Sequence, residues 1–214
     1  MTLSKYVSGL GWQRDLPDFR DYTPDHPMVK EMLGRLKRLK RRAPRPKVDL
    51  REFFAETVSK DSLPIPTAHA CVALAEYFDR RTQGKITSRS ALFLHQMARK
   101  LSRPEGRSGT DIRTALKAVG RFGLPPERYW PSEMCRFGDD PDAALYRLGE
   151  AFHSVRYLRL ESRNSSGSET LNTVKSFLAA GFPCVFGFSA PESASDETDI
   201  LFNPVQESVR EGYA

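Results

Sequence analysis

The cysteines and histidines are the side chains of this sequence that could do the most varied chemistry. A cysteine thiolate beside an imidazole can attack an acyl carbon, and both residue types can bind zinc. The sequence contains three cysteines, Cys71, Cys135 and Cys184, and four histidines, His26, His69, His95 and His153. The cysteines are too few and too scattered for a disulfide framework, and no spacing among the histidines predicts a metal site. We therefore expect buried or half-buried thiols, no metal and no cofactor.

Cys71 lies in residues 61–84, which predict a turn followed by a buried helix. Pro64 and Pro66 restrict the residues before them to extended geometry, so the helix should begin at Pro66 or one residue later. Apolar residues then recur at helical spacing, and Gly84 is suited to end the helix. Free N–H groups and the helix dipole stabilise an anion at such a start, which makes it a natural position for a nucleophile.

The composition predicts a globular protein. The 214 residues are enough to bury a core, in one domain or in two small lobes. Apolar residues make up 39% and charged residues 28% of the chain, and no apolar run approaches the length of a transmembrane segment. Residues 1–15 lack the apolar centre of a signal peptide, so we expect a cytoplasmic location.

A basic segment, residues 30–47, carries much of the net charge of +6. A helix is predicted over residues 27–42, with apolar side chains on one face and basic ones around the rest. Such a helix can contact a protein partner, nucleic acid or an anionic surface, or it can simply be solvated. We favour a protein partner or solvation, because no aromatic residues alternate with the basic ones as single-stranded nucleic acid would need. The candidate contact residues are Arg35, Arg38, Arg41 and Arg42.

The order of the predicted elements is typical of an α+β protein. Residues 11–24 are rich in aspartate, proline and aromatic residues and predict an extended arm. Further helices are predicted over residues 88–101, 110–121, 142–152 and 169–180, with Thr87 or Ser88 capping the first and Thr110 or Asp111 the second. Strands are predicted over residues 48–51, 155–160 and 183–188. Helices followed by strands predict a helical lobe and then a sheet lobe.

Six segments, taken in order, carry a family likeness. They are GWQRDLPDFRDY, PKVDLRE, TAHACVALAEYF, SRSALFLHQMAR, SGTDIRTALKAVGRFGLPPERYWP and LNTVKSFLAAGFPCVFGFS. Together they resemble the papain-like cysteine peptidases of bacteria and archaea, over most of residues 11–214. In that family they correspond to an N-terminal arm, the start of the mature enzyme, the nucleophile helix, two further helical segments, and the helix and strand that open the sheet lobe.

The resemblance implies positions for a nucleophile and a base. The family's nucleophile loop is Gln-Gly-x-x-x-Ser-Cys-Thr-Ala-x-Ala, and its tail is present as TAHA at residues 67–70. Pro66 stands where the cysteine belongs, and the glutamine that donates to the oxyanion is missing. The family's base is a histidine in Gly-His-Ala, which GYA at residues 212–214 matches with Tyr213 at the base position. A phenol ionises near pH ~10 and is a poor base for a mechanism that needs a thiolate and an imidazolium.

The same resemblance implies a two-lobe fold with a cleft between the lobes. The implied units are an arm with the basic helix at residues 1–47, a helical lobe at 48–152 and an antiparallel sheet lobe at 153–214. The sheet lobe looks incomplete, because in the family it continues past this length and includes an Asn-Ser-Trp-Gly segment. The residues placed along the cleft are Asp61, Thr67, His69 and Gly109.

Three functions remain open at this point. The one we favour is a catalytically inactive papain-fold homologue, a pseudopeptidase, that binds a protein or peptide or is a structural subunit of an assembly. The second is an active cysteine peptidase, with Cys71 as a displaced nucleophile or with residues beyond Ala214 completing the site. Cys71 lies more than one turn into its helix, so its sulfur should be buried. The third is a basic adaptor that binds nucleic acid or an anionic surface through residues 30–47.

Overall fold

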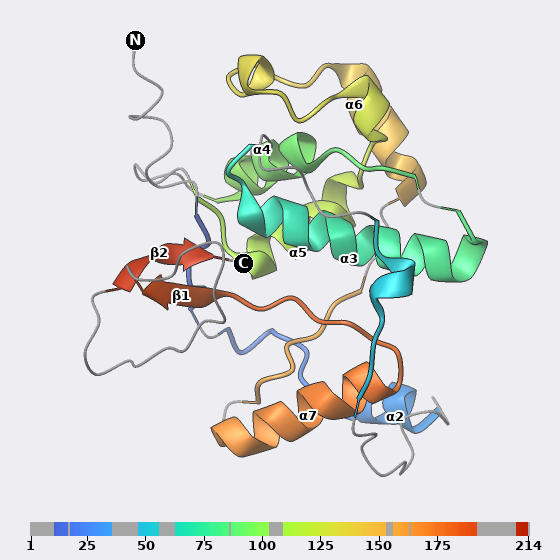
Figure 1. The fold of residues 1–214 in the computed structure, drawn as a ribbon, viewed down its shortest axis with the longest axis vertical. Helices are drawn as coiled ribbons and strands as arrows, with labels where there is room; N and C mark the ends of the chain where they lie inside the picture. Colours follow the sequence, from blue (N-terminus) through green and yellow to red (C-terminus); the bar gives the residue numbers. More distant parts are fainter. Residues whose placement is uncertain are drawn as a thin grey trace.

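The structure is a computed structural model that describes residues 11–16, 18–35, 47–55, 63–85, 87–102, 109–152, 156–162, 164–191 and 209–213. Helices α3 to α6 form one part of the molecule, the helical part (Figure 1). Residues 156–191 and 209–213, which contain helix α7 and strands β1 and β2, are called the C-terminal part; in Figure 1 α7 lies below the helical part and the two strands lie at the left, apart from α7. No helix among the described residues is long and apolar enough to cross a membrane.

Helix α3 spans Pro66–Gln83, which confirms the predicted central helix. Proline is suited to the first helical position because its missing N–H group would have no partner there. At the other end Gly84 adopts a left-handed conformation with φ of 70°, and its N–H donates to the carbonyl of Arg80. Local sequence therefore sets both ends of this helix.

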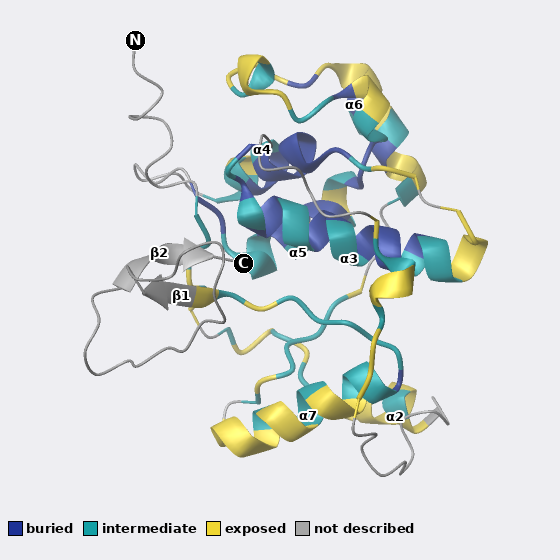
Figure 2. Ribbon diagram, viewed as in Figure 1, coloured by how far each residue is buried: buried dark blue, intermediate teal, exposed yellow. Residues whose placement is uncertain are grey.

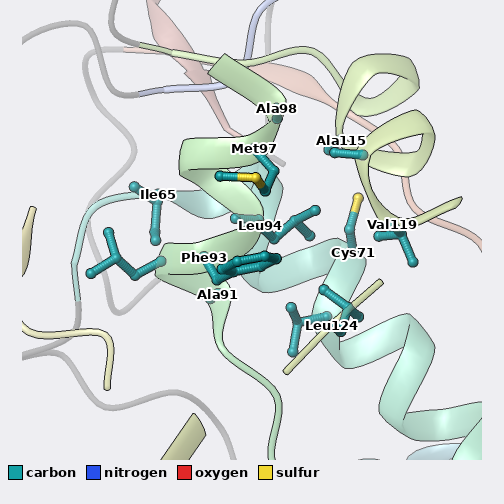
Figure 3. Packing of buried hydrophobic residues seen from close by; sticks show 14 of the residues in the cluster. Ile65, Cys71, Ala91, Phe93, Leu94, Met97, Ala98, Ala115, Val119 and Leu124 are labelled. Carbon is teal, nitrogen blue, oxygen red and sulfur yellow. The ribbon is translucent and has the colours of Figure 1, made fainter. Parts of the chain in front are cut away.

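The hydrophobic core lies among α3, α4 and α5. Helix α4 spans Ala91–Leu101 and α5 spans Ile112–Phe122, and the three helices pack against one another. Figure 2 shows buried positions concentrated on these helices, and Figure 3 shows their side chains in contact. Burial of one large apolar side chain stabilises the fold by ~1.5–3 kcal/mol. The large core residues include Leu63, Ile65, Leu92, Phe93, Leu94, Met97 and Leu124.

Helix α5 begins and ends where the sequence predicts. Its N-cap is Asp111, whose carboxylate accepts the N–H of Thr114 at 2.8 Å. Its C-cap is Gly123, at φ of 69°. The amphipathic pattern between these two residues buries Ala115 and Val119 in the core. As with α3, the bounds follow from local signals.

Helix α4 begins later than predicted. Its N-cap is Ser90, whose hydroxyl accepts the N–H three residues ahead at 3.1 Å, so the predicted caps Thr87 and Ser88 were wrong. Arg89 forms an isolated bridge with Pro126, which keeps the chain extended up to the cap. That bridge joins segments far apart in the sequence and is therefore invisible to a local pattern.

Short helical turns surround the core. Helix α6 spans Ala143–Gly149 and continues into a 3-10 turn, so it is shorter than predicted. A 3-10 turn at Arg51–Phe53 replaces the strand predicted over residues 48–51. The remaining 3-10 turns of the described residues are Glu127–Tyr129, Met134–Arg136 and Glu150–Phe152.

The C-terminal part contains one helix and a small sheet. Helix α7 spans Gly167–Ala179 and begins with a capping box between Ser166 and Glu169. Strand β1, Phe188–Pro191, pairs antiparallel with β2, Val209–Tyr213. These are the strands found among the described residues, so an antiparallel pairing is present but the predicted sheet lobe is not confirmed.

Two of the predicted strands do not form. Residues 156–160 and 182–187 have no regular secondary structure. An apolar, alternating pattern becomes a strand only when a neighbouring strand supplies hydrogen bonds. Within residues 156–160 the N–H of Arg159 instead donates to the carbonyl of Tyr22 in the N-terminal arm, at 2.8 Å.

The N-terminal arm and the basic helix are described in part. Helix α2 spans Pro27–Arg35, which confirms the first half of the helix predicted over residues 27–42. Residues 36–46 lie outside the described part of the chain. The arm runs without regular structure except for an isolated parallel bridge between Trp12 and Thr110.

Candidate functional site

The start of α3 is the position at which the sequence predicts a degenerate nucleophile site. Pro66 is the first helical residue, and the N-cap, Ile65, makes no side-chain hydrogen bond to the helix. The Ile65 carbonyl accepts the N–H groups of Ala68 and His69, both at 3.1 Å. Proline carries neither a nucleophilic atom nor an N–H group. A helix start can activate a nucleophilic side chain, but the proline at this helix start has no nucleophilic atom.

Thr67 faces the loop that precedes α5. Its hydroxyl is buried and donates to the carbonyl of Thr110 at 3.0 Å. The N–H of Gln13 in the N-terminal arm donates to the same carbonyl at 3.1 Å. Gly109 is buried beside this residue. Thr67, Gly109 and Thr110 therefore lie together near the start of α3, and both lone pairs of the Thr110 carbonyl are occupied.

His69 does not have the environment of a general base. Its Nε2 atom lies 3.1 Å from the carbonyl oxygen of Leu63, and since a carbonyl only accepts, Nε2 carries the proton. Burial lowers the pKa of His69, and the hydrogen bond to Leu63 opposes this in part. The ring is thus a neutral group that fixes the loop before α3. Of the predicted cleft residues, Asp61 lies outside the described residues.

Cys71 is buried in the core. Figure 3 shows its sulfur directed toward Ala115 and Val119 of α5, and the residue is only 1% exposed. Burial, with a smaller contribution from the charge of Asp111, raises the pKa of Cys71 to about 12. Because the thiolate is the reactive form of cysteine, this thiol is inert near neutral pH.

Tyr213, the predicted base position, lies in the small sheet. It is the last residue of β2 and pairs with Phe188 of β1. Its side chain lies outside the description, as does that of Arg35, the last residue of α2. The other candidate contact residues of the basic segment, Arg38, Arg41 and Arg42, also lie outside it.

The N-terminal arm contacts the loop before α5 and the segment before β1, which the sequence pattern did not indicate. Trp12 forms the bridge with Thr110 and also packs on Gly187, just before β1. A Cβ atom on Gly187 would lie 2.1 Å from the indole ring, so only glycine permits this contact. The Gly-Trp pair at the start of the arm is the signal that sequence reasoning could have used. Trp12 thus bridges the loop before α5 and the segment that leads into β1.

No group of three potential metal ligands among histidine, cysteine, aspartate and glutamate occurs in the described part of the chain. A cavity of about 430 Å³ lies between residues 47–54 and the C-terminal part. Its walls include Leu50, Phe54, Leu178 and Cys184. Burial raises the pKa of the Cys184 thiol, so this cysteine is also a weak nucleophile. Cys135 is exposed and lies in a 3-10 turn.

No family model matches the sequence. Over 106 residues, or 49% of this chain, the sequence is 30% identical to an uncharacterized peptidase C1-like protein of Acanthamoeba polyphaga mimivirus. The matched region covers 34% of that protein, so the chain spans about a third of this relative.

Two solved structures resemble the chain over most of its length. Xylellain, a cysteine protease from Xylella fastidiosa, is 24% identical, with a TM-score of 0.71 over 97% of this chain and 78% of that chain. Digestive procathepsin L 3 of the Tenebrio molitor larval midgut is 16% identical, with a TM-score of 0.52 over 86% of this chain and 64% of that chain. These likenesses confirm the predicted resemblance to papain-like cysteine peptidases and show that the chain has their fold.

Proposed function

We propose that this chain is a catalytically inactive papain-fold homologue that binds a peptide or protein segment in its cleft, alone or as a subunit of an assembly. The observation that carries this proposal is Pro66 at the first position of α3, where the family's nucleophile belongs. The proline side chain at that position has no nucleophilic atom and cannot attack a carbonyl. The fold around it remains intact, with a buried Thr67 and Gly109 beside the helix start.

The alternative nucleophile is disfavoured by its surroundings. Cys71 is buried and has a pKa of about 12, so at pH 7 almost none of it is thiolate. His69, the histidine nearest to it in sequence, has its Nε2 atom committed to Leu63. A displaced-nucleophile mechanism would need both groups to be released from their present contacts. The basic adaptor gains no support from the described residues, since most of residues 30–47 lie outside them.

Turnover measurements test the absence of catalysis. The purified full chain is incubated with a mixture of fluorogenic peptides, with and without a thiol-reactive epoxide, and labelled residues are located by mass spectrometry. We expect no turnover above the blank. Turnover that stops when one cysteine becomes labelled would reject the proposal. Pro66→Cys is the matched variant, and we expect it to be inactive too, because the oxyanion glutamine is missing from the sequence and Tyr213 stands at the base position.

Peptide binding is tested separately. A photoreactive library of extended peptides is mixed with the full chain, and the crosslinked residues are mapped. We expect crosslinks to Trp12 and Gly187, which are half-buried and lie beside the buried Thr110. Crosslinks confined to α6, or none at millimolar peptide, would contradict a binding role for the cleft while leaving the question of catalysis to the first experiment.

A further inference from the structure

The N-terminal segment of residues 11–25, which we call the strap, contacts both parts of the molecule. Trp12 pairs with Thr110 before α5 and packs on Gly187 before β1. The Ser162 hydroxyl, before α7, donates to Asp25 near the other end of the strap at 2.5 Å. The strap therefore touches the C-terminal part at both of its ends.

Two aspartates of the strap are turned inward, and each meets an arginine. Asp21 pairs with Arg113 of α5 at 2.5 Å, and Asp15 pairs with the same arginine at 2.8 Å. Asp15 also pairs with Arg159, which precedes α7, at 2.8 Å. The side chains of Asp21, Arg113 and Asp15 are 8%, 12% and 18% exposed, so solvent screens these ion pairs weakly. One cluster of charges thus joins the helical part to the segment before α7.

The outward face of the strap carries apolar side chains instead of charged ones. Leu16 is 82% exposed and Phe19 is 84% exposed, whereas Asp15 and Asp21 are largely covered. Burying charged groups is favourable only when they are paired, so this inverted arrangement exists because the arginines provide the pairing. The two carboxylates, rather than Leu16 and Phe19, anchor the middle of the strap.

The direct connection between the two parts lies elsewhere. The Tyr77 hydroxyl of α3 donates to the carbonyl of Gly181 at 2.9 Å, and Phe78 contacts Phe182 with ring centroids 6.2 Å apart. Among the described residues, helices α3 to α5 do not pack extensively on α7. The C-terminal part is therefore held at two places, at residues 181–182 and along the strap.

We propose that the strap is a clamp that fixes the C-terminal part against the helical part, with the charge cluster of Asp15, Asp21, Arg113 and Arg159 as its fastening. Removing the two carboxylates leaves Arg113 without its ion-pair partners and releases the Arg159 guanidinium from the strap, so that only the main-chain hydrogen bond from Arg159 to Tyr22 remains there. The C-terminal part then pivots about the contact between Tyr77 and Gly181. The helical part keeps its fold, because its core lies among α3, α4 and α5 and contains no described residue of the strap.

A distance measurement in the full chain tests the clamp. Spin labels are attached to the exposed Cys135 and to Cys introduced by Ser176→Cys on the exposed face of α7, in a Cys184→Ser background. Cys71 is buried and stays unlabelled. We expect a single narrow distance distribution in this parent protein and a distribution at least about twofold broader in Asp15→Asn/Asp21→Asn.

Asp18→Asn is the matched control, because Asp18 lies in the strap but pairs only with the neighbouring Arg20 among the described contacts. It should leave the distribution narrow. Arg159→Gln removes the ion pairs on the C-terminal side alone and should broaden the distribution while the pairing of Asp21 with Arg113 persists. Unchanged distributions in Asp15→Asn/Asp21→Asn would overturn the proposal. Loss of helical circular dichroism in that variant would also overturn it, since the clamp would then be inseparable from the helical core.

Discussion

Tyr77 and Gly181 are 104 residues apart in the sequence and are joined by a 2.9 Å hydrogen bond from the phenol to the main-chain carbonyl. The ring of Tyr77 is fully buried, and it also contacts Phe53 and Phe54. Arg81, one turn further along α3, donates to the same carbonyl of Gly181. Tyr77 and Arg81 of α3 thus connect the helical part to Gly181, which follows the end of α7.

Replacing Tyr77 by phenylalanine removes the hydroxyl and keeps the ring. We expect Tyr77→Phe to lower the free energy of unfolding by ~0.5–1.5 kcal/mol, toward the lower end because Arg81 still satisfies the Gly181 carbonyl. Urea unfolding measures this. Tyr146→Phe is the control, because the Tyr146 hydroxyl bonds only to the exposed Lys100 at 3.3 Å among the described contacts. A Tyr146→Phe variant that is as destabilised as Tyr77→Phe would contradict the prediction.

Two glycines with nearly the same positive φ angle differ in ψ, 4° at Gly84 and −163° at Gly123, and in the space around them. Gly84 has φ of 70°, and a Cβ atom added there would meet nothing within 4 Å, whereas at Gly123, φ 69°, a Cβ would lie 1.8 Å from the Gly149 carbonyl oxygen. We expect Gly84→Ala to cost ~1–2 kcal/mol, the usual cost of a left-handed residue. Gly123→Ala should cost more than ~3 kcal/mol or prevent folding, because the main chain must move. Equal urea unfolding midpoints for Gly84→Ala and Gly123→Ala would show that the close approach of Gly123 to Gly149 does not restrict residue 123.

His95 should make stability depend on pH. Burial, with smaller contributions from Arg99 and His69, lowers the pKa of His95 to about 4 from an ordinary value of 6.5. The unfolded chain therefore binds a proton between these two pH values that the folded chain does not. Stability from this residue is present above pH 6.5 and is lost as the pH falls toward 4, by ~3 kcal/mol in total.

His95→Leu should remove this contribution. The measurement is urea unfolding at pH 7.0, 5.5 and 4.5 for both proteins, and the quantity compared is the difference between them, because Glu76 and Glu127 act in the opposite direction. Burial raises the pKa values of these two carboxyls, so their contribution to stability is lost as the pH rises. Parallel curves for His95→Leu and the parent protein would contradict the assignment to His95.

The three cysteines should react in the order of their exposure. Cys135 is exposed, Cys184 is half-buried with a raised pKa, and Cys71 is buried with a pKa of about 12. With a disulfide reagent at pH 8 we expect fast labelling of Cys135 and slower labelling of Cys184. Cys71 should react at least ~10³-fold more slowly than Cys135, because so little thiolate is present and the core must open first. Rapid labelling of Cys71 in the folded protein would instead favour the displaced-nucleophile mechanism.

Several features of the fold could be predicted because their causes are local. Pro66 and Gly84 determine the ends of α3 through their restricted and permissive backbones, and Asp111 determines the start of α5 through its own carboxylate. Pro66, which the resemblance aligns with the family's nucleophile, is likewise visible in the sequence. A missing nucleophile could therefore be predicted before any coordinates were known, and like the absence of catalysis it stays a proposal.

Other features depend on contacts between distant segments. The strands predicted over residues 155–160 and 183–188 had the right composition, but strand formation needs a partner, and residues 156–160 lie against the N-terminal arm instead. Ser90 became the cap of α4 because Arg89 bridges to Pro126. No local pattern contains the information about which segment will be near.

The sequence by itself determined helices α3 and α5 with their caps and placed a proline, which has no nucleophilic atom, at residue 66, since these follow from properties of single residues and their neighbours in the chain. Tertiary structure alone decided that Cys71 is an inert core residue with a pKa of about 12 and that the His69 ring is hydrogen-bonded to the Leu63 carbonyl. It also decided that Asp15 and Asp21 turn inward to two arginines. Burial and ion pairing arise from what surrounds a group in space, and that arrangement exists only after the chain has folded.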